Sequence, residues 1–133
     1  MNNWYGDELS EHMEWRKSLK ERFPELFRQD RYLEVSVARG WHTLIEELLT
    51  NIQMVVCERG GVFAVRQIKE KFGGLRFYCE GSDEMIKALI VAAEERAVCT
   101  CEWCGGTGEN RLHTGWWKVL CDEHNDAWVK RHD

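Results

Sequence analysis

Four residues near the end of the sequence have the types and the spacing of a metal site. Cys101 and Cys104 are separated by two residues, and Cys121 and His124 repeat that spacing after a gap of 16 residues. Thiolate and imidazole groups are preferred ligands of zinc, and each closely spaced pair can hold one ion from a tight turn. The sequence therefore predicts a zinc site with these four residues as ligands.

A complete set of four protein ligands predicts a structural zinc ion. Catalytic zinc keeps one coordination position open for water or substrate, whereas structural zinc is closed. We therefore expect the ion to stabilise the C-terminal segment, and we assign no catalytic residue. Cys99 and His113 are reserve ligands if one of the four does not bind. Four idle or buried residues without metal are the simpler alternative, and Cys57 and Cys79 are expected to be small core residues.

The residues around the four ligands predict the fold of this segment. Three glycines follow the first ligand pair, as a tight turn requires. Two short strands are expected on either side of Gly115. A helix is expected from residue 122, because acidic residues lie in its first turn and basic ones in its last. Turn, hairpin and helix in this order predict a treble-clef-like zinc module over residues 99–133.

Treble-clef modules also occur in HNH-type nucleases, which provides an enzymatic alternative. Such enzymes place a general-base histidine on the hairpin and metal-binding residues around the helix. Here His113 lies in the predicted hairpin, and Asn125 and His132 lie in the predicted helix. The match is partial, because no second histidine or aspartate directly precedes the turn. A metal-dependent nuclease is therefore the second hypothesis, after a protein without enzymatic activity.

The preceding residues, 1–98, predict an α+β body that carries this module. Apolar residues recur at helical spacing in three stretches. Between the second and third stretches, apolar and polar residues alternate on both sides of a Gly-Gly pair, as in a β-hairpin. The third helix has apolar residues on both of its faces and is expected to be well buried. The expected elements are helices over residues 7–23, 41–52 and 82–98, and a β-hairpin over residues 62–81 between the second and third helices.

The predicted hairpin concentrates positive charge on one of its faces. If Gly73 and Gly74 form the turn, alternation places Lys69, Lys71, Arg76 and Tyr78 together, opposite an apolar face. Like charges on facing strands are unfavourable unless an anionic partner binds them. We expect these four residues to form the partner-binding surface. An ordinary solvated face, partly neutralised by Glu80, is the alternative.

Composition restricts the class of protein. The chain has 133 residues, of which 44% are hydrophobic and 31% charged, which is typical of a globular protein that needs no disulfides to build a core. The net charge of −5 favours a protein partner over a nucleic acid. No signal-peptide pattern opens the sequence, and the longest apolar run, residues 88–93, is too short to cross a bilayer. We therefore expect no membrane contact and a reducing cytoplasm, where close-set cysteines bind metal.

Several short motifs resemble a known family. The pair "GW" at residues 40–41, the stretch "KEKFGGLRFYCEG" at 69–81 and the two spaced ligand pairs are similar to those of a widespread family of small, uncharacterised phage and bacterial proteins. The resemblance implies a cytosolic accessory protein, in the host cytoplasm if phage-encoded, and it supplies no reaction. For a phage-encoded protein, inhibition of a host enzyme or defence system is one hypothesis. We therefore expect a non-enzymatic zinc-binding protein. A structural or assembly role, including a homo-oligomer, is a third hypothesis.

Overall fold

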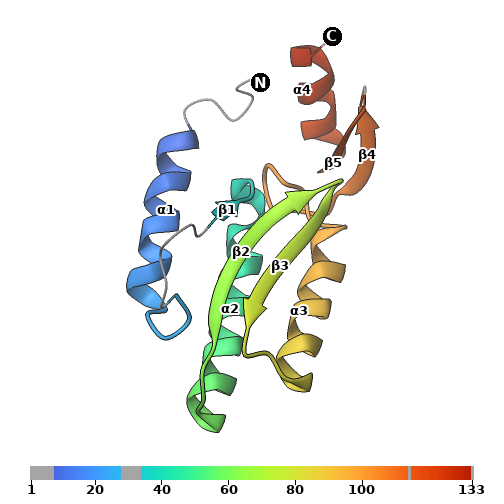
Figure 1. Ribbon diagram of the computed structural model, residues 1–133. Coiled ribbons are helices and arrows are strands. Elements are labelled where there is room, and N and C mark those ends of the chain that lie inside the picture. The colour runs from blue at the N-terminus through green and yellow to red at the C-terminus, as the bar shows by residue number, and fades with distance from the viewer. Residues whose placement is uncertain (1–7, 28–33, 114, 133) are drawn as a thin grey trace.

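The computed structural model describes residues 8–27, 34–113 and 115–132, and within them the chain is mixed α+β (Figure 1). The elements in chain order are α1 (Glu8–Arg22), β1 (Glu34–Ser36), the 3-10 helix η1 (Arg39–Trp41), α2 (His42–Arg59), β2 (Ala64–Lys71), β3 (Gly74–Glu80), α3 (Glu84–Ala97), β4 (Glu109–His113), β5 (Trp116–Leu120) and α4 (Asp122–His132).

The body contains a three-stranded sheet in the order β1-β2-β3. β2 and β3 form the expected antiparallel hairpin, and β1 pairs with β2 in parallel. The body was predicted as helix, helix, hairpin and helix, so β1 is a correction to that order. A strand of three residues has only one buried side chain, Val35, and this is too short a pattern to recognise as alternating.

Helices cover one face of this sheet and leave the other without a helix among the described residues (Figure 1). The core between the layers contains Ile45, Leu49 and Ile52 of α2 together with Ile68 and Leu75 of the hairpin, all fully buried or nearly so. The apolar periodicity of the second predicted helix therefore identified the core face correctly. The opposite face of the sheet is the one on which the sequence placed the positive charges.

The third helix is buried less completely than its composition suggested. Asp83 caps α3 by accepting a hydrogen bond from the Ile86 N–H at 2.8 Å, as a helix N-terminus requires. Ile86 and Ile90 face the core, but Met85 and Val91 are exposed. The expectation of a well-buried helix was wrong, because only one side of α3 packs against the hairpin and α2.

The turn of the β2–β3 hairpin lies one residue earlier than predicted. Lys71 pairs with Gly74 and Lys69 with Arg76, so Phe72 and Gly73 form the two-residue turn, with φ angles of 54° and 78°. A Gly73–Gly74 turn predicts that Lys71 faces Arg76 and that Phe72 faces Leu75, and both pairs are wrong. The strand residues nevertheless keep their predicted faces, because the register differs by two positions, which is an even number. Phe72 does not keep its face: alternation places it on the apolar side, but it lies in the turn and is 67% exposed.

Helix α1 is attached to α2 by a cluster of aromatic side chains. The Trp15 and His42 rings stack at 3.7 Å with an interplanar angle of 4°. His42 Nε2 lies 3.2 Å from His12 Nδ1, and the other nitrogen of His12 lies 2.9 Å from the Val35 carbonyl oxygen. Burial, followed by the nearby His12, lowers the pKa of His42 to about 4. His42 is therefore neutral in this contact between α1 and α2 at neutral pH.

None of the helices in the described residues is long and apolar enough to cross a membrane.

Candidate metal centre

The structure brings the four predicted ligands together at one end of the molecule. The ligand atoms of Cys101, Cys104, Cys121 and His124 all lie within 4.8 Å of one another. Cys101 Sγ lies 3.8 Å from His124 Nδ1, Cys104 Sγ lies 4.0 Å from Cys121 Sγ, and Cys121 Sγ lies 3.1 Å from His124 Nδ1. Zinc–ligand bonds of about 2.0–2.3 Å give a tetrahedron with edges of roughly 3.5–3.8 Å. These residues can therefore hold one metal ion.

The first ligand pair is shaped by a tight turn. The Cys101 N–H donates to the Gly106 carbonyl at 2.7 Å, and the Gly105 N–H donates to the Cys101 carbonyl at 2.9 Å. Gly105 has a φ of 80°, which a residue with a side chain rarely adopts. The Gly106 N–H also points at Cys104 Sγ, 3.4 Å away, as amides do around bound thiolates.

The second ligand pair lies at the start of α4. Cys121 directly follows β5, and the Asn125 N–H donates to the Cys121 carbonyl at 2.8 Å, which begins the helix. The first turn of the helix then places His124 Nδ1 beside the sulfurs, and the His124 N–H lies 3.5 Å from Cys121 Sγ. Strand and helix together therefore fix both ligands of this pair.

The cysteine thiols influence each other's ionisation. Burial would raise the pKa of Cys101, but hydrogen bonds from the backbone of Cys104, Cys121 and Trp103 lower it overall. The pKa of Cys104 is raised, by burial first and also by the neighbouring Cys101. Several adjacent thiolates repel one another, and a bound cation removes that repulsion. The cluster is therefore suited to a cation.

The metal cluster is attached to the body at Gly40 and Trp41. The Gly40 N–H donates to the Glu102 carbonyl at 2.8 Å, and a Cβ atom on Gly40 would lie 2.2 Å from the Cys101 carbonyl oxygen. Trp41 is fully buried, and its Nε1 donates to the Thr100 carbonyl at 2.9 Å. The "GW" pair thus has a physical role, because only glycine allows the two backbones to approach this closely.

A buried ion pair supports the same junction, and sequence reasoning did not find it. Glu102 is 1% exposed, and its carboxylate accepts a hydrogen bond from the Val119 N–H at 2.7 Å. Lys118 Nζ lies 3.5 Å from the other carboxylate oxygen. Burial raises the pKa of Glu102, although Lys118 opposes this. The only sequence signal was a charged residue between two ligands.

The other cysteines and His113 lie outside the cluster. Cys99 is exposed, and its sulfur lies 3.4 Å from the Arg96 carbonyl oxygen, so it does not replace one of the four ligands. His113 lies beside the Trp128 ring, and its Nε2 is buried without a hydrogen-bond partner in the described part of the chain. Cys57 is exposed, which contradicts the prediction of a core residue. Cys79 is half-buried against the core, as predicted.

The predicted partner surface lies on the sheet face that carries no helix. Lys69 and Arg76 are directly opposite one another across β2 and β3, and Tyr78 is 47% exposed on the same face. Within the described residues, neither lysine nor Arg76 forms an ion pair with a carboxylate. Glu80, expected to neutralise this face, instead pairs with Arg66. In the part of the chain that the structure describes, no ion pair therefore offsets the repulsion between these facing cations.

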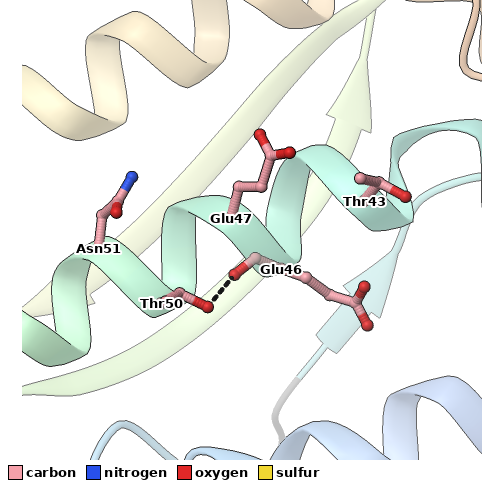
Figure 2. A pocket seen from close by; sticks show the side chains of 5 residues that line it. All are labelled: Thr43, Glu46, Glu47, Thr50 and Asn51. Carbon is pink, nitrogen blue, oxygen red and sulfur yellow. Dashed lines mark hydrogen bonds between the residues drawn. The ribbon is translucent and has the colours of Figure 1, made fainter.

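A polar hollow of about 430 Å³ lies on α2, away from the metal cluster (Figure 2). Its two carboxylates point to different sides of the helix. Glu46 accepts hydrogen bonds from Trp15 and Arg22 of α1, and Glu47 forms an ion pair with Arg96 of α3. These carboxylates therefore connect α2 to its two neighbouring helices.

Comparison of the chain with models of protein families, with curated proteins and with solved structures found no match.

Proposed function

We propose that the cluster of Cys101, Cys104, Cys121 and His124 binds structural zinc and that residues 99–133 form a treble-clef-like module. The ligand set carries this proposal, because three thiolates and one imidazole are typical of structural zinc sites. All four positions of a tetrahedral ion are taken by protein side chains, so none remains for a substrate. A tight turn, a hairpin and a helix that contribute the ligands in this order support the treble-clef assignment.

Elemental analysis of the purified protein tests the metal. The expected result is one zinc ion per chain. After substitution of cobalt for zinc, the absorption spectrum should show four protein ligands and no bound water. Cobalt with four protein ligands including three thiolates gives strong tetrahedral and charge-transfer bands. A weak, octahedral spectrum, or protein that is ordered without metal, would contradict a closed structural site.

The protein as a whole is proposed to be a non-enzymatic binding protein of the cytoplasm. Its contact surface, the cationic face, comprises Lys69, Lys71, Arg76 and Tyr78. Two facing cations that form no ion pair within the described residues, next to an exposed tyrosine, support this choice. The acidic chain as a whole favours an acidic protein surface over a nucleic acid, and a phage or bacterial accessory role, such as inhibition of a host enzyme or defence system, fits the resemblance of the hairpin.

Charge reversal tests the cationic face. Lys71→Glu combined with Arg76→Glu is expected to abolish capture of the native partner from the host, since opposite charges at the contact become like charges. Lys87→Glu on α3 is the matched control, because Lys87 is an exposed lysine that does not belong to the cationic face. Equal capture by both variants would remove the cationic face from consideration.

A nuclease is the second candidate, and one observation favours it. His113 Nε2 on the hairpin and Asn125 Oδ1 on α4 are both buried without a hydrogen-bond partner in the described residues, and both atoms are of types that can bind a metal ion. Incubation with DNA and magnesium or manganese tests this function. Cleavage that is lost in His113→Ala would establish it and displace the non-enzymatic proposal.

A further inference from the structure

The turns of the two hairpins meet beside the cationic face. A hollow of about 270 Å³ lies between them and is lined by Glu70, Lys71 and Phe72 from the first hairpin and by Gly115, Trp116 and Trp117 from the second. The side chains of Phe72, Trp116 and Trp117 are 67%, 56% and 38% exposed. Three large aromatic side chains thus remain accessible in one small region of the molecule.

Phe72 adopts a backbone conformation that a bulky side chain disfavours. Its φ is 54°, in the left-handed region where glycine and asparagine are common and aromatic residues are rare. An exposed side chain contributes little to the core, so the fold gains no obvious stability from an aromatic residue here. Strain of this kind commonly accompanies function.

Contacts from both hairpins hold this turn in place. The Gly73 N–H donates to the Glu70 carboxylate at 2.8 Å, and Asn110 Nδ2 on β4 donates to the Phe72 carbonyl at 3.4 Å. Gly73 has a φ of 78°, which favours glycine, and Asn110 Oδ1 fills the space that a Cβ atom would occupy. The aromatic groups are therefore displayed on a preorganised framework, which lowers the entropic cost of binding.

Charge indicates which partner fits this hollow. Lys71 lines the hollow and also belongs to the cationic face, and its Nζ lies 5.7 Å from the centre of the Phe72 ring. Lys69 and Arg76 extend the positive charge along the hairpin. A complementary ligand therefore carries acidic groups beside an apolar side chain. Glu70 also lines the hollow and repels any anion placed beside it, so the acidic groups of the ligand must lie over Lys69, Lys71 and Arg76 while its apolar group enters the hollow.

We propose that the hollow between the hairpin turns is the anchoring part of the binding surface and receives an apolar side chain from an acidic segment of a partner protein. The inference rests on the proposed binding function and specifies the chemistry of the partner. Phe72, Trp116 and Trp117 contact the apolar group, while Lys69, Lys71 and Arg76 contact the flanking carboxylates. Aromatic residues at the centre of a contact and charges around it are typical of binding hot spots.

Selection of random linear peptides displayed on phage, with the full-length protein as bait, tests the proposal. We expect enriched peptides to combine aspartate or glutamate with a large apolar residue. A synthetic copy should bind the wild type and lose roughly 30-fold in affinity to Trp116→Ser or Phe72→Asn. Met85→Ser is the control, because Met85 is equally exposed on α3 but distant from the hollow.

Phe72→Asn separates a binding role from a structural one. Asparagine tolerates a positive φ, so this variant is expected to keep or raise the melting temperature while it weakens peptide binding. A lower melting temperature together with unchanged peptide affinity would overturn the proposal.

The remaining outcomes distinguish this inference from the proposed function. Peptide binding that depends on Lys71 and Arg76 but not on Phe72 or Trp116 would overturn the hollow and leave the cationic face intact. Failure to enrich any peptide would overturn the inference, and native-partner capture would still test the face. Binding of oligothymidylate without acidic peptides, lost in Trp116→Ser, would overturn it in favour of a nucleic-acid surface.

Discussion

The body and the C-terminal segment differ in what holds them together. Among the described residues, 22 buried hydrophobic residues of the body form one cluster, which runs through its helices and its three-stranded sheet and which Val119 of β5 joins. Around the metal ligands, the second cluster contains three buried residues, Cys101, Leu120 and Trp128, with Trp103 and Cys121 packed against it. Burial of apolar surface can stabilise the body, but three side chains cannot stabilise a segment of this length.

If the proposed zinc site is correct, the C-terminal segment has two other sources of stability. One is the metal ion that Cys101, Cys104, Cys121 and His124 could hold. The other is attachment to the body through Gly40, Trp41 and Val119, the last of which belongs to the body cluster. Loss of metal, loss of attachment and acidification should therefore affect the two regions unequally.

Removal of a metal ligand should have the largest effect and should be confined to one region. Cys101→Ser, or chelation of the wild type, is expected to unfold residues 99–133 while the body keeps its fold, because structural zinc contributes on the order of 10 kcal/mol. NMR amide spectra of the two regions measure this directly. Cys57→Ser, at an exposed cysteine outside the cluster, should leave both regions folded. Simultaneous unfolding of both regions would refute the division.

Loss of the buried ion pair between Glu102 and Lys118 should have the second-largest effect on stability. Lys118→Met leaves the Glu102 carboxylate buried without its cation and is expected to lower the free energy of unfolding by about 3 kcal/mol. Adding Glu102→Gln should restore part of that loss, because the amide removes the charge. Denaturant titration measures both variants. Lys87→Met, at a mostly exposed pair, should change stability by less than about 0.5 kcal/mol and provides the comparison.

A methyl group at the junction should weaken attachment without touching the ligands. Gly40→Ala places a Cβ atom against the Cys101 carbonyl oxygen and is expected to cost about 2–3 kcal/mol. Gly106→Ala is the matched control, because its Cβ would lie 3.4 Å from Cys104 Sγ, at ordinary contact distance. Thermal melts of the two variants should differ clearly. Equal melting temperatures would mean that the junction carries little stability.

Acidification should weaken the contact between α1 and α2 by the smallest amount. The pKa of His42 is about 4 in the folded chain and near 6.5 when unfolded, so between these values the unfolded state binds more protons. Stability from this group is therefore complete above pH 6.5 and is lost as the pH falls towards 4. His12, Glu46 and Arg39 all act on this group. Solvent screening reduces the effect to roughly 1–2 kcal/mol.

His42→Phe isolates this contribution. Phenylalanine can keep the stacking contact with Trp15 but cannot titrate, so the variant should lose this part of the acid dependence. Unfolding free energies at several pH values between 4 and 7 provide the measurement. The same slope in variant and wild type would assign the acid sensitivity to other groups.

Residue spacing identified the four candidate metal ligands, and periodicity predicted most of the helices and strands. Ligand spacing is a local property, since two residues two positions apart can share a turn whatever the rest of the chain does. Helical periodicity likewise identified the buried face of α2, and strand alternation placed Lys69, Arg76 and Tyr78 on the face opposite the core. These predictions agree with the structure because each depends on only a few neighbouring residues.

How these elements meet depends on contacts between segments that are distant in the sequence. β1 joins the sheet through a partner strand some thirty positions away. The turn settles on Phe72 and Gly73, where Glu70 and Asn110 contact it, and not on the Gly-Gly pair that local preference favours. The approach of Gly40 to Glu102 and the burial of Glu102 beside Lys118 likewise join distant segments. Such contacts depend on packing between elements, and local sequence patterns do not predict that packing.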